Sequence, residues 1–128
     1  ILRAGADAIV DMATPLMQKV SQSGKNVTWM SDPMHGNTFT HSSGYKTRAF
    51  NDVMKEIKGF FESCSAANVW PGGVHLELTG DDVTECIGGV DEIDEIESKY
   101  ETSCDPRLNA RQGLDLAFAI SELLTVRR

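Results

Sequence analysis

The chain has 128 residues, of which 41% are hydrophobic, and its formal net charge is −7. This size and apolar content suit one core, so we expect residues 1–128 to form a single segment. The sequence has no basic stripe for nucleic acid, no apolar run that could span a membrane and no signal-peptide pattern. Because it does not begin with Met, we interpret it as a piece of a longer protein.

Hydrophobic spacing predicts a first helix over residues 6–21, with Ile9, Ala13 and Met17 on one face and Pro15 requiring a kink or a late start. A short β-prone run follows at residues 27–30 and ends before Pro33. Residues 36–46 are rich in Gly, Asn and Ser, which predicts a long polar loop. A second helix is expected from about Thr47 to Cys64.

In the second half, Pro71-Gly72-Gly73 predicts a turn and the alternation at residues 74–78 predicts a strand. The acidic residues 91–97 are interpreted as a short, solvated surface helix rather than an ion site. Residues 102–104 are a third strand candidate, and a last helix is expected from about residue 108 to 124.

This alternation of helices and strands predicts an α/β fold with parallel strands, either a doubly wound sheet or a (β/α)8 barrel. A complete barrel needs roughly 250 residues, so the chain can supply only part of one.

Polar side chains follow each predicted strand: Asp32 and His35 after the first, Glu77 at the end of the second and Asp105 after the third. The carboxyl ends of parallel strands form the active-site rim of such folds, so these groups are expected to converge. His with carboxylates is a mixed ligand set that suits Mn²⁺, Fe²⁺, Co²⁺ or Zn²⁺. Hydrogen bonding within the loops is the alternative, because acids and histidines are common at strand ends.

Other chemistry has weaker support. The sequence has no GxGxxG before a helix, no Walker lysine and no GxSxG elbow. Lys46 and Arg48 precede the second helix, where they either hold an anion or are simply solvated. Cys64, Cys86 and Cys104 form no CxxC pair, which is typical of a reducing, intracellular setting, and we interpret each as a small buried hydrophobic group.

Several multi-residue segments, in one register over almost the whole chain, resemble the class II 3-deoxy-D-arabino-heptulosonate 7-phosphate (DAHP) synthases. They are SDPMHGNT at residues 31–38, KTR at 46–48, PGGVHLELTG at 71–80, VTEC at 83–86 and CDPRLN at 104–109. The resemblance implies that the chain is the C-terminal portion of a (β/α)8 TIM barrel, about three βα units. It also implies the condensation of phosphoenolpyruvate with erythrose 4-phosphate, the entry step of the shikimate pathway.

The resemblance further implies a divalent metal, Mn²⁺ or Co²⁺, bound by one Cys, one His, one Glu and one Asp. His35, Glu77 and Asp105 match three of these ligands, and no cysteine of this chain matches the fourth. Arg3 matches an arginine that contacts the phosphate of phosphoenolpyruvate.

Further roles are expected for residues near these positions. Lys46 and Arg48 are expected to help bind substrate, and His35 with Asp32 to form the catalytic group. Asp32 and His75 are near enough in sequence to be supporting groups or proton carriers, and a structural role is the alternative.

The expected partners are the two substrates and either the rest of the barrel or further copies of the chain, because a partial barrel leaves sheet edges and apolar helix faces uncovered. By itself the piece is expected to be unstable or self-associated, and inactive. The expected location is the cytoplasm, or a plastid if the source is a plant. Two rival functions stay open: a non-catalytic barrel piece used for interaction or assembly, and a related metal-dependent aldolase of secondary metabolism.

Overall fold

The computed structural model describes residues 1–126 of the chain as an α/β structure. Its elements are α1 (Ile9–Gln22), β1 (Trp29–Ser31), the 3₁₀ helix η1 (His35–Asn37), β2 (Thr38–Thr40), β3 (Lys46–Arg48), α2 (Phe50–Ala66), β4 (Pro71–Val74), the 3₁₀ helix η2 (Ile96–Lys99) and α3 (Ala110–Val126). None of the helices in this part of the chain has the length and apolar character needed to cross a membrane.

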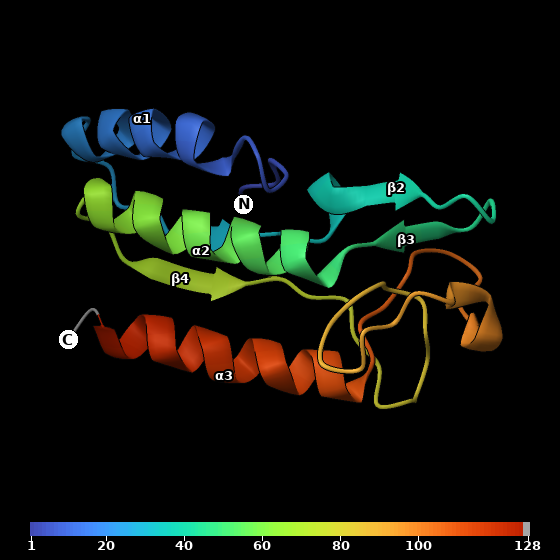
Figure 1. Cartoon of the computed structure of the whole chain (residues 1–128). Helices are drawn as coiled ribbons and strands as arrows, with labels where there is room; N and C mark the ends of the chain where they lie inside the picture. Colours follow the sequence, from blue (N-terminus) through green and yellow to red (C-terminus); the bar gives the residue numbers. More distant parts are fainter. Residues whose placement is uncertain (127–128) are drawn as a thin grey trace.

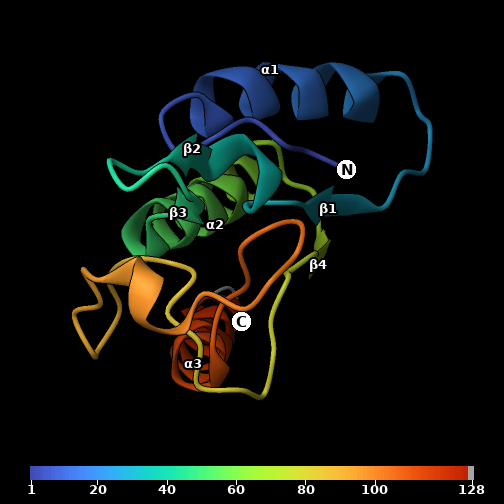
Figure 2. The same cartoon turned by 90° about the vertical axis from the view of Figure 1, so that its right-hand side faces the viewer.

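Parallel pairing connects segments that are far apart in sequence. β1 pairs with β4 in parallel, and isolated parallel bridges join Leu2 to Ser31 and Leu78 to Leu108. Figure 2 shows β1 and β4 side by side at one edge of the molecule. The predicted parallel α/β organisation is therefore confirmed, and the described residues form small sheets that do not close into a barrel.

The three long helices lie roughly side by side, and α2 packs between α1 and α3 (Figure 1). α1 buries Ile9, Ala13 and Met17, as its spacing predicts. Gly59 of α2 lets α1 approach closely, because a Cβ at this position would lie only 2.5 Å from Cγ2 of Ile9. The core is formed mainly by these helix faces together with Trp29 of β1.

The first predicted boundary differs because Gly5, at φ +85°, turns the chain. Residues 6–8 form a turn, and the N–H of Ala6 donates to Oδ1 of Asn37 at 2.9 Å. α1 therefore begins at Ile9, and Pro15 lies inside it.

The expected long loop at residues 36–46 is wrong in part, because it contains η1 and most of a hairpin. β2 and β3 pair antiparallel, and the hairpin closes through the N–H of His41, which donates to the carbonyl of Tyr45 at 2.8 Å. The β-prone Thr38-Phe39-Thr40 segment forms one strand despite the polar residues around it. Because β3 occupies residues 46–48, α2 begins at Phe50 rather than near Thr47.

The second and third predicted strands are also displaced. The predicted turn Pro71-Gly72-Gly73 is strand, because these glycines lie directly against β1; a Cβ at Gly72 would be 2.8 Å from the carbonyl oxygen of Trp29. The N–H of His75 still donates to the carbonyl of Ser31 in β1 at 2.8 Å, and two residues later the carbonyl of Glu77 accepts from the N–H of Leu108 at 3.0 Å.

This parallel contact at residue 108 replaces the strand predicted at residues 102–104, which lie in a loop with bends at residues 103–105. The short helix expected over residues 91–97 is wrong in part, because residues 91–92 form a turn, Ile93 bridges to Gly88 and only residues 96–97 begin η2, whose Ile96 is buried. The last helix begins at Ala110, two residues later than expected.

Candidate functional site

Side chains from three separate segments meet beyond the ends of the parallel strands. His35 follows β1, Glu77 follows β4, and Asp105 precedes the parallel contact at Leu108. One ligand atom from each of His35, Glu77 and Asp105 lies within 4.8 Å of the other two. The structure thus brings together the three residues that the sequence selects as metal ligands.

Asp32 fixes the orientation of His35. Its carboxylate lies 2.8 Å from Nδ1 of His35 through Oδ2, and its Oδ1 accepts from the N–H groups of Met34 and His35 at 3.1 and 3.2 Å. Burial acts to raise the pKa of Asp32, but the hydrogen bonds from the His35 ring and from these two N–H groups outweigh it and lower the pKa. A carboxylate that holds Nδ1 leaves Nε2 available on the other side of the ring.

Nε2 of His35 faces Glu77, with 3.2 Å between Nε2 and Oε1. In a neutral imidazole that is protonated on Nδ1, both of these atoms carry lone pairs, which repel at this distance. A cation between them, either a proton or a metal ion, removes the repulsion. Histidines that ligate metal ions commonly donate their other ring N–H to a carboxylate, as His35 can to Asp32.

Two exposed cations border this cluster. Nη2 of Arg3 lies 2.9 Å from Oδ2 of Asp32, and Nζ of Lys46 lies 3.4 Å from Oδ1 of Asp105. Their side chains are 57% and 60% exposed, so both remain accessible to a dissolved anion. His75 is a further neighbour, with its ring stacked on that of His35 at a centroid distance of 6.1 Å.

Arg48 differs from the other two cations, because its side chain is fully buried. It donates to Oε2 of Glu77 at 2.6 Å, to Oγ1 of Thr38 at 2.8 Å and to the carbonyl of Pro106. Arg48 and Lys46 lie in β3, just before α2; the alternative of solvated side chains is wrong for Arg48, and anion binding by either residue stays a prediction.

Two buried glutamates next to the cluster are not predicted from the sequence. Glu56 of α2 accepts from the N–H of Ala4 at 2.9 Å and from Nδ2 of Asn37 at 2.7 Å. Burial raises the pKa of Glu56, and these hydrogen bonds offset the shift only in part. The sequence does carry one signal for the burial of Glu56: it lies three residues after Val53 and one before Ile57, on an apolar helix face.

Glu85 is the second buried glutamate. It accepts from the side chain of Arg107 at 2.8 and 3.0 Å, and from the N–H groups of Glu101, Thr102 and Arg107. Burial acts to raise the pKa of Glu85, but the hydrogen bonds from Arg107 and from the loop outweigh it and lower the pKa. No local sequence pattern predicts the burial of Glu85, because its hydrogen-bond partners lie 16 to 22 positions away.

The cysteines stay outside the cluster of candidate ligands in the described part of the chain. Cys64 and Cys86 are buried, as expected, and burial raises the pKa of Cys86 to about 12. The expectation of burial is wrong for Cys104, which is exposed in a loop.

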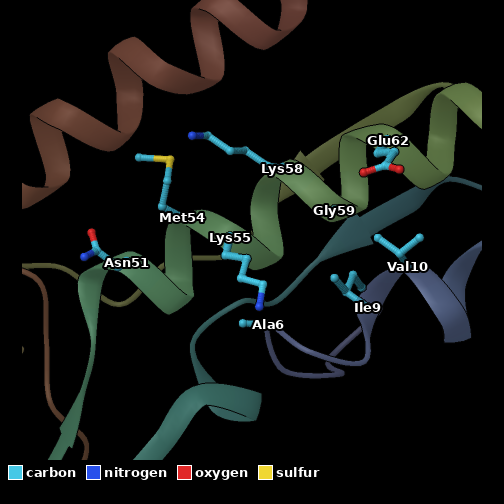
Figure 3. Close-up of a pocket in the computed structure, with 9 residues that line it drawn as sticks. All are labelled: Ala6, Ile9, Val10, Asn51, Met54, Lys55, Lys58, Gly59 and Glu62. Carbon is cyan, nitrogen blue, oxygen red and sulfur yellow. The ribbon is translucent and has the colours of Figure 1, made fainter.

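A separate hollow of about 460 Å³ lies between α1 and α2 (Figure 3). Figure 3 shows the side chains that line it, among them Ile9, Val10, Met54 and Lys55. None of its lining residues belongs to the cluster of His35, Glu77 and Asp105, so the chemistry and this hollow occupy different places.

Comparisons with known proteins agree with the sequence resemblance. A family-wide sequence model described as "Class-II DAHP synthetase family" matches residues 1–121. Proteins called phospho-2-dehydro-3-deoxyheptonate aldolase are similar: one from Streptomyces coelicolor is 57% identical over 125 residues and one from Streptomyces lividans is 53% identical over 125 residues. A protein from Mycolicibacterium smegmatis, called phospho-2-dehydro-3-deoxyheptonate aldolase AroG, is 47% identical over 126 residues.

These matches cover 96%, 96% and 97% of this chain, respectively. The chain spans 28% of the S. coelicolor protein, 85% of the S. lividans sequence and 27% of the M. smegmatis protein.

Proposed function

We propose that this chain, which belongs to the class-II DAHP synthetase family, provides the metal-binding edge of a DAHP synthase. In that reaction phosphoenolpyruvate, erythrose 4-phosphate and water yield DAHP and phosphate, as the entry step of aromatic amino acid biosynthesis. The observation that carries the proposal is the convergence of His35, Glu77 and Asp105 within 4.8 Å.

The donor set suits a divalent metal such as Mn²⁺ or Co²⁺, because one imidazole nitrogen and two carboxylates combine borderline and hard ligands. His35, Glu77 and Asp105 would hold the ion, with Asp32 positioning His35 through Nδ1. When bound, the metal supplies Lewis-acid polarisation of a carbonyl or activation of a water. The fourth ligand that the resemblance implies, a cysteine, has no counterpart in the described cluster.

Arg3 and Lys46 are proposed to bind the anionic substrates. Both substrates carry phosphate, and an arginine fork matches phosphate oxygens particularly well. Arg3 and Lys46 are exposed beside Asp32 and Asp105, so a bound anion can reach them at the edge of the metal centre. His35 is the catalytic residue of this scheme through its contact with the ion, and Asp32 acts through it.

For the fold, we propose that residues 1–128 form one segment of a (β/α)8 barrel, about three βα units. The parallel contacts of Leu2, β1, β4 and Leu108 support this, as do α1, α2 and α3, which follow Leu2, β1 and Leu108 along the chain. The remaining units would come from the rest of the barrel or from a further copy. A cytoplasmic location stays a prediction, and a plastid gains no support from relatives in Streptomyces and Mycolicibacterium.

The test uses the complete natural polypeptide that contains these residues. Phosphoenolpyruvate loss is followed by its ultraviolet absorbance with erythrose 4-phosphate and Mn²⁺, and DAHP is identified as product. We expect metal-dependent turnover that the His35→Ala variant abolishes, while an exposed-site control, Lys19→Gln on α1, keeps it. No turnover in a protein that binds Mn²⁺ would favour the non-catalytic rival, and turnover only with another acceptor would favour the related aldolase.

A further inference from the structure

Arg48 places a full positive charge in the interior of the molecule. Its side chain has no exposed surface, and its Nη2 has no hydrogen-bond partner among the described residues. A buried guanidinium with one unpaired donor is less favourable for folding than a well-packed apolar side chain of similar size. Fold stability alone therefore gives no reason for an arginine at this position.

The three groups that Arg48 contacts belong to the three segments that bear the candidate ligands. Thr38, which accepts from Nε, follows η1 with His35, and its hydroxyl donates to the carbonyl of Met34 at 3.2 Å. Glu77, which accepts from Nη1, is itself a candidate ligand. Pro106, whose carbonyl also accepts from Nη1, is the residue after Asp105.

The contact with Glu77 also determines which carboxylate oxygen faces the centre. Arg48 binds Oε2 at 2.6 Å, whereas Oε1 lies 3.2 Å from Nε2 of His35. A guanidinium on Oε2 restrains the carboxylate so that Oε1 points at the histidine. One side chain thus restrains the orientation of Glu77 and the spacing of all three segments.

We propose that Arg48 is a positioning residue that assembles the metal centre, rather than a group that contacts substrate. This inference rests on the proposed metal site. An arginine is required because its planar fork donates in several directions at once; a lysine at this position has a single ammonium, which cannot reproduce the fork's contacts with Thr38, Glu77 and Pro106.

The test is Mn²⁺ binding by the complete natural polypeptide, measured from the electron paramagnetic resonance signal of the unbound ion. Variants Arg48→Met and Arg48→Lys are compared with wild type, and we expect each to lose about tenfold or more in Mn²⁺ affinity. Thr38→Val removes one contact of the guanidinium and leaves the arginine in place. We expect Thr38→Val to lose less Mn²⁺ affinity than the Arg48 variants. If Arg48→Met does not fold, Thr38→Val and Arg48→Lys together test the role of Arg48.

Val53→Ala is the matched control, because Val53 is fully buried on α2 and belongs to no site described above. It should lower the thermal midpoint and leave Mn²⁺ affinity unchanged. A folded Arg48→Lys with wild-type Mn²⁺ affinity overturns the inference, as does an equal affinity loss in Val53→Ala. A raised KM for either substrate with unchanged Mn²⁺ affinity also overturns it, because direct substrate contact predicts that pattern.

The wild type and the His35→Ala variant keep this inference separate from the proposed function. If the wild type binds no Mn²⁺, or if His35→Ala binds it equally well, the proposed metal site itself fails. If His35→Ala abolishes binding while the Arg48 variants retain it, only the role of Arg48 fails.

Discussion

Two fully buried glutamates hold the segments on either side of the candidate centre, and their surroundings differ in charge. Glu56 restrains the segment of His35 through Asn37, whereas Glu85 restrains the loop that contains Asp105 through Arg107. The hydrogen-bonding side chain beside Glu56 is a neutral amide, and the one beside Glu85 is a guanidinium. The pKa is accordingly raised for the first and lowered for the second.

The difference shows that burial alone does not determine the charge of an interior carboxyl group. Desolvation favours the neutral acid at both positions. Only at Glu85 do a cation and several N–H donors reverse that preference. The loop of Asp105 is therefore held by an ion pair, and the segment of His35 by a carboxyl that ionises less readily.

Substitution of the ion-paired glutamate should have the largest effect on stability. Glu85→Gln leaves the Arg107 guanidinium without its counter-charge and sets an amide NH₂ against N–H donors of the loop. We expect a loss of about 3 kcal/mol in the free energy of unfolding. This is the lower end of the range for breaking a buried ion pair, because the side chain of Arg107 is 31% exposed. Urea unfolding of the complete polypeptide at neutral pH measures this loss.

Glu97→Gln on η2 is the control. If Glu85→Gln lowered the free energy of unfolding no more than Glu97→Gln does, this expectation would be contradicted. The deficit should also depend on pH, because the folded pKa of Glu85 lies below its ordinary value of 4.5. Its ionised form stabilises the protein above that value, and the contribution is lost as the pH falls through the folded pKa. The difference between wild type and Glu85→Gln should therefore shrink in acid.

Replacing the cation while keeping its charge should have an intermediate effect. Arg107→Lys preserves an ion pair with Glu85 but loses the two-pronged contact through Nε and Nη2. We expect a loss of about 2 kcal/mol in the free energy of unfolding, since one hydrogen bond to a charged group is removed. Urea unfolding again provides the measurement, and a loss as large as that of Glu85→Gln would show that geometry, not charge, dominates the pair.

The smallest effect is expected at the glutamate without a cation. Glu56→Gln keeps an acceptor for the N–H of Ala4 and removes a charge that burial disfavours, so its stability at neutral pH should lie within about 1 kcal/mol of wild type. Because the folded pKa of Glu56 is above 4.5, the cost of ionising it grows as the pH rises through that folded pKa.

The stability of Glu56→Gln relative to wild type should therefore improve with rising pH, opposite in sign to the trend for Glu85→Gln. Urea-unfolding midpoints of both variants and of wild type, measured from about pH 3 to about pH 8, test these two opposite pH dependences. Parallel slopes for the two variants would refute the contrast between the two regions.

Much of the architecture is readable in short-range patterns. The stripes of Ile9, Ala13 and Met17 and of Phe50, Val53 and Ile57 predict α1 and α2, because helical burial repeats every three to four residues. The boundaries of the strands are harder to predict from the sequence. Pro71-Gly72-Gly73 has the composition of a turn, and only the close approach of β1 makes it a strand.

For the candidate site, the sequence by itself determined which groups could serve as ligands. The positions of His35, Glu77 and Asp105 relative to the alternating elements, and the shared segments around them, identified these residues. Their roles stay predictions, whereas their proximity is a feature of the structure.

Only the tertiary structure decided what holds these groups in place. No local pattern predicts that Arg48 or Glu85 is buried, and only its place on an apolar helix face marks Glu56, yet all three are fully buried. Their partners lie between 10 and 58 positions away, from Thr38 at the near end to Pro106 at the far end. Local patterns report a residue's own helix or strand, and pairings across such separations exist only once the chain has folded.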